Sequence, residues 1–223
     1  MLIQTLTKTE QVRRAILIEI LRGQLRPGQR LIEAALSKEL GVAQATVNAA
    51  LQDLHNQGLV TKVLNRSTNI SRYTEEQIRK LFSVRALLEP AAAAEVAAQW
   101  RGEAKARLEE PVRQMRSAAG RHDLQGFCLA DYNFHQEVYS LTRNSFLIQA
   151  CQAIAAAPFA YILCDHLEAL PTDYAALAED HQDLIRAMEA GPEEAARATR
   201  RRIEQWLNHS LSALAAVPAV PAK

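Results

Sequence analysis

The spacing of hydrophobic residues divides the chain into two parts. Before residue 73, short helical patterns cover residues 9–23, 33–40 and 44–57, and strand-like runs cover residues 59–64 and 67–71. From residue 75 onward, apolar residues recur every three or four positions almost to the end, which is the period of an amphipathic helix. The sequence therefore predicts a mainly α protein in which the only strands lie near the N-terminus.

A glycine turn between two short helices is the most informative local pattern in the first part. Gly41 follows the helix pattern EAALSKEL and can adopt the left-handed backbone that ends a helix. In the next helix, Val47, Leu51 and Leu54 share one face, so this face packs and the opposite face stays free. Gly58 ends that helix, and two strands follow. These elements predict a winged helix-turn-helix, whose second helix has the size of a DNA major groove.

The second part is predicted to be an all-helical antiparallel bundle. Thr74 and Gln77 have the spacing of a capping box at the start of its first helix. The helical patterns cover residues 75–100, 103–119, 124–141, 145–167, 171–190 and 193–215. The expected domains are a DNA-binding domain over residues 1–73, an all-α effector domain over residues 74–217 and a tail over residues 218–223.

Charge is distributed unevenly between the two parts. Residues 1–73 contain ten Lys or Arg against five Asp or Glu, a net charge of +5, whereas the remainder has a net charge of −4. A basic head suits a polyanionic partner such as DNA. Cys128, Cys151 and Cys164 are widely spaced in helical patterns, which predicts reduced thiols in a cytoplasmic protein. No apolar run reaches the ~20 residues of a membrane span, so no membrane partner is expected.

Several short motifs, in this order, support a family resemblance. They are residues 23–28 (GQLRPG), residues 36–42 (LSKELGV), residues 57–60 (QGLV), residues 84–89 (VRALLE), Asp131 with Phe134-His135, and Asn144. With them the chain resembles GntR-family transcription regulators of the FadR subfamily, which join a winged helix to an FCD-type ligand-binding domain. The resemblance implies a homodimer that binds a palindromic operator in double-stranded DNA. It also implies a small organic acid as effector, often bound near a divalent metal.

The recognition helix departs from the family pattern. Its usual start, Ser-Arg-Thr-Pro-Val-Arg-Glu-Ala-Leu, reads AQATVNAAL here, so Gln44 and Asn48 replace two arginines. Gln and Asn pair with an adenine edge, whereas Arg prefers guanine or phosphate. Base or backbone contacts are therefore expected, although both residues could be only polar surface. The predicted DNA contacts are Gln44, Thr46 and Asn48 in the recognition helix, Arg66 in the wing, and Arg30, Lys38 and Lys62 nearby.

The effector domain carries part of a metal-binding pattern. Asp131 and His135 are four residues apart on one predicted helix, so they share a face and suit one ion. By resemblance, His181 is the next ligand, while Arg202 or Ile203 occupies the place of the family's final histidine. Neither can bind a metal. Two alternatives follow: a weakly held divalent metal (Zn, Ni or Mn), or no metal and an Arg202 that pairs with an effector carboxylate, or with Asp131 in an empty pocket.

Two further residues are expected at the effector on the basis of the resemblance. Arg85 is the family's inward-facing arginine, although Glu89, four residues on, could instead be its ion-pair partner. Asn144 is the other, although it could instead cap the helix that follows it.

The function expected from these features is that of an effector-responsive transcription regulator, not an enzyme, and no catalytic residue is predicted. One alternative is a metal-dependent hydrolase acting on a small substrate, because a metal-bound water could attack it. The other is a regulator that has lost DNA binding and acts through protein contacts, since the usual arginines are missing.

Overall fold

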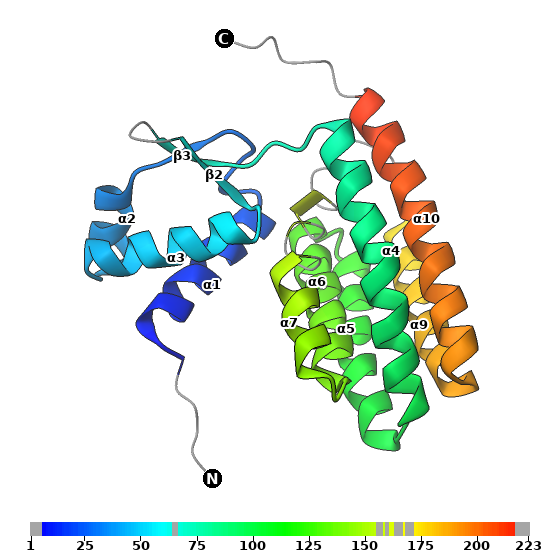
Figure 1. The fold of residues 1–223 in the computed structure, drawn as a ribbon. Helices are drawn as coiled ribbons and strands as arrows, with labels where there is room; N and C mark the ends of the chain where they lie inside the picture. The colour runs from blue at the N-terminus through cyan, green and yellow to red at the C-terminus, as the bar shows by residue number, and fades with distance from the viewer. Residues whose placement is uncertain are drawn as a thin grey trace. The chain divides into compact units, whose positions relative to one another are not determined.

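The structure of the chain, a computed structural model, divides into two compact units, residues 1–72 and 73–223 (Figure 1). It describes residues 6–63, 67–154, 158, 161–162, 167 and 172–216. Helix dominates the described residues, which confirms the predicted mainly α fold.

The first unit is a winged helix-turn-helix, as predicted. A three-stranded antiparallel sheet with the order β1-β3-β2 accompanies its helices. The first strand was not predicted, because two residues are too few to show a period. Its elements are α1 (Lys8–Leu21), β1 (Arg30–Leu31), α2 (Glu33–Leu40), α3 (Gln44–Asn56), β2 (Val60–Val63) and β3 (Ser67–Ile70).

The turn between α2 and α3 depends on Gly41. Its φ of 64° is left-handed, and its N–H bonds to the carbonyl of Ser37 to end α2. On the inner face of α3, Val47, Leu51 and Leu54 are fully buried. This burial fixes α3 against the unit and leaves its opposite face exposed.

The second unit is the predicted helical bundle. Thr74 and Gln77 form the predicted capping box at the start of α4. Helix α10 packs along α4, and α5 packs against both α6 and α9 (Figure 1). The described helices are α4 (Glu75–Ala98), α5 (Gly102–Gly120), α6 (Leu124–Leu141), α7 (Ser145–Ile154), α9 (Tyr174–Ala190) and α10 (Pro192–Ala216).

Helix α7 differs from what its apolar sequence suggested. The helical pattern over residues 145–167 predicts a helix in the middle of the bundle, but Phe146 is 81% exposed near the start of α7. Hydropathy measures what a residue prefers, not whether a neighbouring helix covers it. The exposed ring therefore marks α7 as a surface helix at this end.

The cysteines bear out the prediction only in part. Cys151 is a free thiol, and burial raises its pKa to about 12. Cys128 is disulfide-bonded, so the prediction of a reduced thiol is wrong there. Sequence spacing does not show which sulfurs tertiary packing brings together. Cys164 lies outside the described residues.

None of the helices in the described ranges combines the length and the apolar character that crossing a bilayer requires.

Candidate functional site

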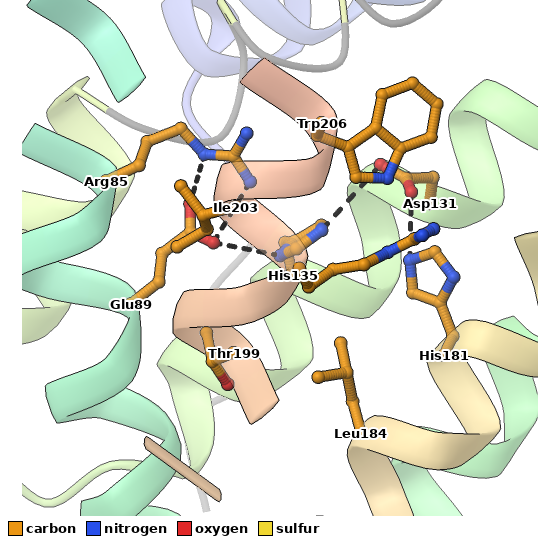
Figure 2. Close-up of a pocket in the computed structure, with 10 residues that line it drawn as sticks. Arg85, Glu89, Asp131, His135, His181, Leu184, Thr199, Ile203 and Trp206 are labelled. Atoms are coloured by element: carbon orange, nitrogen blue, oxygen red, sulfur yellow. Dashed lines mark hydrogen bonds and ion pairs between the residues drawn. The ribbon is translucent and has the colours of Figure 1, made fainter. Parts of the chain in front are cut away.

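A pocket lined mainly by charged and polar side chains lies inside the second unit, between four helices (Figure 2). Its cavity volume is about 20 Å³, which is room for a single ion or water. The lining residues are Arg85 and Glu89 from α4, Asp131 and His135 from α6, His181 and Leu184 from α9, and Thr199, Arg202, Ile203 and Trp206 from α10.

One wall of the pocket is a buried ion pair on α4. Arg85 donates from Nε to Oε1 of Glu89 at 2.5 Å and from Nη2 to Oε2 at 3.0 Å. The two side chains are only 3% and 4% exposed. Burial acts to raise the pKa of Glu89, but the positive charges of Arg85 and His135 outweigh it and hold this pKa below its ordinary value. Glu89 is therefore a carboxylate inside the bundle.

Asp131, His135 and His181 meet on the other side of the pocket (Figure 2). Nε2 of His181 lies 3.0 Å from Oδ1 of Asp131, and Nε2 of His135 lies 3.9 Å from Oδ2 of Asp131. One ligand atom from each residue lies within 4.8 Å of the other two. The helices thus bring together all three residues that the sequence proposed as metal ligands.

The hydrogen bonds of His181 show how these residues could hold a cation. Its Nδ1 lies 2.8 Å from the carbonyl oxygen of Leu177, which only accepts, so Nδ1 must carry a proton. Nε2 then faces the carboxylate of Asp131, a second acceptor. This contact is attractive only if the ring is doubly protonated or if a metal ion replaces the Nε2 proton. Metal-binding histidines are commonly oriented in the same way, because the ring nitrogen that does not bind the metal donates its N–H to a backbone carbonyl.

One carboxylate oxygen of Asp131 has no hydrogen-bond donor among the described residues. Its side chain is 3% exposed, and its Oδ2 makes no hydrogen bond within the described part of the chain. Burial acts to raise the pKa of Asp131, but the hydrogen bond from His181, together with the charge of Arg85, outweighs it and lowers this pKa. A buried, ionised oxygen without a hydrogen bond is costly, so it fits a position beside a cation. Burial lowers the pKa of His135, which favours the neutral ring that metal coordination requires.

Arg202, on α10, also lines the pocket. Its Nη1 donates to Oδ2 of Asp180 at 2.5 Å, and its guanidinium lies over the ring of Trp206 at 5.2 Å. Its Nη2 is buried and makes no hydrogen bond among the described residues. Burial lowers the pKa of Arg202, but a guanidinium stays protonated in proteins. Both Arg202 and Ile203, which sequence comparison could not separate, line the pocket.

The structure places the remaining effector candidates differently. Arg85 lines the pocket and pairs with Glu89, so the ion pair is confirmed, while its contact with an effector stays a prediction. Asn144 is not among the lining residues; its Oδ1 accepts from the N–H groups of Phe146 and Leu147 and caps α7. Nothing in this position supports an effector contact for Asn144.

The sequence did not indicate every residue of the pocket. Glu89 was considered only as a partner of Arg85, and Thr199, Trp206 and Leu184 were not singled out. The spacing of Thr199, Ile203 and Trp206 along α10 would have placed them on one face, but without a family motif this spacing looks like ordinary core.

The predicted DNA contacts form a second candidate site on the first unit. Gln44 and Asn48 are exposed on α3, and Thr46 is half-buried beside them. Lys38 on α2 is exposed, as is Arg30 on β1.

Asn48 and Lys62 each make a hydrogen bond within the unit. Nδ2 of Asn48 donates to Oε1 of Glu33 at 2.8 Å. Nζ of Lys62 donates to Oε1 of Gln52 at 3.3 Å, which joins the second strand to α3. Arg66 lies outside the described residues. The role of Glu33 was not anticipated, because fifteen residues separate it from Asn48 along the chain.

We expect Arg85→Ala to lower the free energy of unfolding by about 3–5 kcal/mol, because it leaves Glu89 charged and buried without its partner. Arg79→Ala is the matched control. Arg79 forms an ion pair with the same spacing on the same helix, but both of its partners are more than half exposed, and such pairs contribute little. Chemical denaturation measures both variants. Equal losses in the two would contradict the importance assigned to the buried pair.

Two family models match successive stretches of the chain. The sequence model described as bacterial regulatory proteins, gntR family, matches residues 8–70, and the FCD domain matches residues 80–205. An HTH-type transcriptional regulator of Agrobacterium vitis, described as uncharacterized, is 30% identical over 113 residues, which are 49% of this chain. The matched stretch spans 66% of that relative, slightly less than two thirds of its length.

Solved structures share the fold over nearly the whole chain. E. coli McbR/YncC has a TM-score of 0.78 and 20% identity, covering 93% of this chain and 99% of that one. A putative GntR transcriptional regulator from Rhodococcus sp. RHA1 has a TM-score of 0.74 and 21% identity, covering 92% and 98%. At such identities the likeness establishes the fold alone. The two family matches show that this chain belongs to the gntR family of bacterial regulatory proteins and carries an FCD domain.

Proposed function

We propose that this regulator binds a palindromic operator as a homodimer in the cytoplasm, and that a small organic acid in the pocket of the second unit controls its affinity for DNA. The observation that carries the proposal is the buried, charged pocket on the helix that directly follows the winged helix-turn-helix. Four residues separate β3 from α4, and α4 supplies Arg85 and Glu89. Any ligand that moves this pair acts on the helix nearest the DNA-binding unit in the chain.

DNA binding is assigned to the exposed face of α3. Gln44 and Asn48 can read base edges, and Arg30 and Lys38 can contact phosphate. The +5 charge of residues 1–73 supports a duplex partner.

A divalent metal is the proposed cofactor, with Asp131, His135 and His181 as its protein ligands. The left-over Oδ2 of Asp131 and the orientation of His181 support this assignment. When bound, such an ion supplies positive charge and Lewis acidity toward an effector oxygen. With Arg202 where a further histidine ligand is expected, the protein contributes three ligands, and we expect weaker binding than in relatives with four.

The effector is proposed to be a small carboxylic acid. Arg202 lines the pocket, its buried Nη2 makes no hydrogen bond among the described residues, and a guanidinium pairs well with a carboxylate. A cavity of about 20 Å³ is too small for such a molecule as it stands. Binding must therefore displace lining side chains, and this displacement gives the effector a way to favour one conformation of the protein over another.

A homodimer is proposed through the α4–α7 side of the bundle. Leu87 on α4 is 70% exposed and Phe146 on α7 is 81% exposed. The two helices pack together, and the N–H of Arg143 donates to Glu95 at 2.8 Å where α7 begins. Large apolar side chains exposed on a packed pair of helices are typical of an association surface.

The hydrolase alternative finds no support, because the matching families and the relatives are transcription regulators. The alternative of a regulator without DNA binding is decided by the duplex-binding experiment below.

For the metal, we expect wild-type protein incubated with Zn²⁺, Ni²⁺ or Mn²⁺ and then desalted to retain stoichiometric metal in elemental analysis. His135→Ala should lose it, since one of three ligands is removed. Arg202→His should bind more tightly than wild type, because a neutral ligand replaces a cation. His209→Ala, outside the lining residues, is the control. Wild-type protein without any of these metals would reject the proposed site.

For the effector, we expect at least one of acetate, lactate, malonate and citrate to raise the melting temperature of the wild-type protein. The same acid should change the affinity of the protein for duplex DNA flanking its own gene. Arg202→Ala should lose both responses, because its guanidinium is the proposed carboxylate partner. Arg200→Ala, an exposed neighbour on α10, should keep them. A response that survives in Arg202→Ala would exclude this role.

For the dimer, we expect Phe146→Glu to convert the protein to a monomer in light scattering and to weaken its binding to duplex DNA flanking its own gene. A single winged helix contacts only half of a palindrome, so affinity falls with the loss of the partner. Ile32→Glu, at an exposed apolar residue of the first unit, is the control for oligomeric state and should stay dimeric. A wild-type protein that binds no such fragment at low salt would instead favour the alternative without DNA binding.

A further inference from the structure

We propose that Glu33 is a positioning residue that sets the base preference of Asn48. The inference rests on the proposed DNA binding and assigns a role to a residue outside the set expected to touch DNA. Glu33 is the first residue of α2, and Asn48 lies in the second turn of α3. Their hydrogen bond, 2.8 Å between Nδ2 of Asn48 and Oε1 of Glu33, joins the two helices of the helix-turn-helix.

This bond fixes which end of the amide faces outward. A carboxylate only accepts, so the Asn48 atom that faces Glu33 must be the nitrogen. The bond uses one N–H of the amide and leaves Oδ1 and the second N–H. Neither makes another hydrogen bond within the described residues, and Asn48 is exposed.

The two remaining groups of the Asn48 amide, Oδ1 and the second N–H, are complementary to one base. An acceptor beside a donor is complementary to adenine, which offers N6–H and N7 in the major groove. An amide that is free to rotate has two nearly equivalent orientations, because the last torsion of Asn is broad. In one orientation the amide oxygen selects bases with a donor, and in the other the nitrogen selects bases with an acceptor. Glu33 excludes the orientation in which the nitrogen replaces the oxygen, so Asn48 can select one base instead of accepting several.

The charge of Glu33 has a separate effect. A carboxylate close to the DNA-facing side of α3 repels phosphates, so it weakens binding to every sequence alike. This effect depends on the charge alone, whereas the orientation of Asn48 depends on a group that only accepts. Glu33→Gln removes the charge, but its amide can either accept from Nδ2 or donate to Oδ1 of Asn48, so it no longer fixes the orientation of Asn48.

The test is selection from a randomised duplex library by full-length wild type, Glu33→Ala, Glu33→Gln, Asn48→Ala and the double alanine variant, followed by sequencing. We expect wild type to prefer adenine at one base pair of each half-site, by roughly 5- to 150-fold over other bases. Asn48→Ala should erase this preference, and Glu33→Ala should reduce it at the same base pair. The double variant should lose no more than Asn48→Ala, because Glu33 acts through Asn48.

Two variants separate positioning from charge. Glu33→Gln should reduce the base preference, because its amide permits both orientations of Asn48, while it binds all sequences more tightly. Glu39→Ala, which removes an exposed negative charge from the same helix, should leave the preference unchanged. Thermal denaturation of each variant checks that the unit stays folded.

The outcomes distinguish this inference from the function it rests on. Glu33→Ala with an unchanged preference, or with a loss at a different base pair from Asn48→Ala, overturns the positioning role while leaving DNA binding intact. A wild-type protein that enriches no sequence overturns the proposed DNA binding and this inference together.

Discussion

Charge buried among helices is the constraint on which the second unit depends. Inside the bundle water cannot solvate a carboxylate or a guanidinium, so each needs a protein partner at close range. Arg85 has Glu89 on its own helix, whereas Asp131 relies on His181 across the pocket. Arg202 reaches Asp180, which is 41% exposed at the rim. Because most of these partners come from different helices, the positions of α6, α9 and α10 are coupled through the charges they share.

The first unit uses polar groups in the opposite way. Its DNA-facing side chains are exposed and neutral where arginines are usual in the family, so water satisfies them until a ligand replaces it. A neutral amide binds less strongly than a guanidinium and gains selectivity only when its orientation is fixed. On the proposed DNA contacts, the hydrogen bond between Glu33 and Asn48 matters more here than the same bond would beside a long, always-charged side chain. The proposal thus makes base selectivity depend on α2 as well as on α3.

Local patterns predicted the elements of this fold well, and long-range contacts were where they failed. The bounds of α6 and the capping box of Thr74 follow from spacing alone, since both are decided within a few residues. The two-residue β1 and the exposure of Phe146 depend on which distant segment lies alongside, which periodicity does not encode. At the pocket, the sequence indicated Asp131, His135 and His181 through family spacing. Glu89 needed the structure, because only burial distinguishes it from a solvated surface partner.

The charge balance of the pocket links the two ligands proposed for it. Glu89 and Asp131 carry two negative charges, and Arg85 and Arg202 carry two positive ones, so the lining is neutral when both imidazoles are neutral. A divalent cation adds two positive charges in a space that water barely enters. With a histidine in place of Arg202 the excess would be smaller by one charge. An anionic effector offsets this excess, so each ligand should strengthen the binding of the other, as linkage requires. On this proposal, an arginine at position 202 in place of a histidine weakens the metal site and also makes metal binding more dependent on the acid.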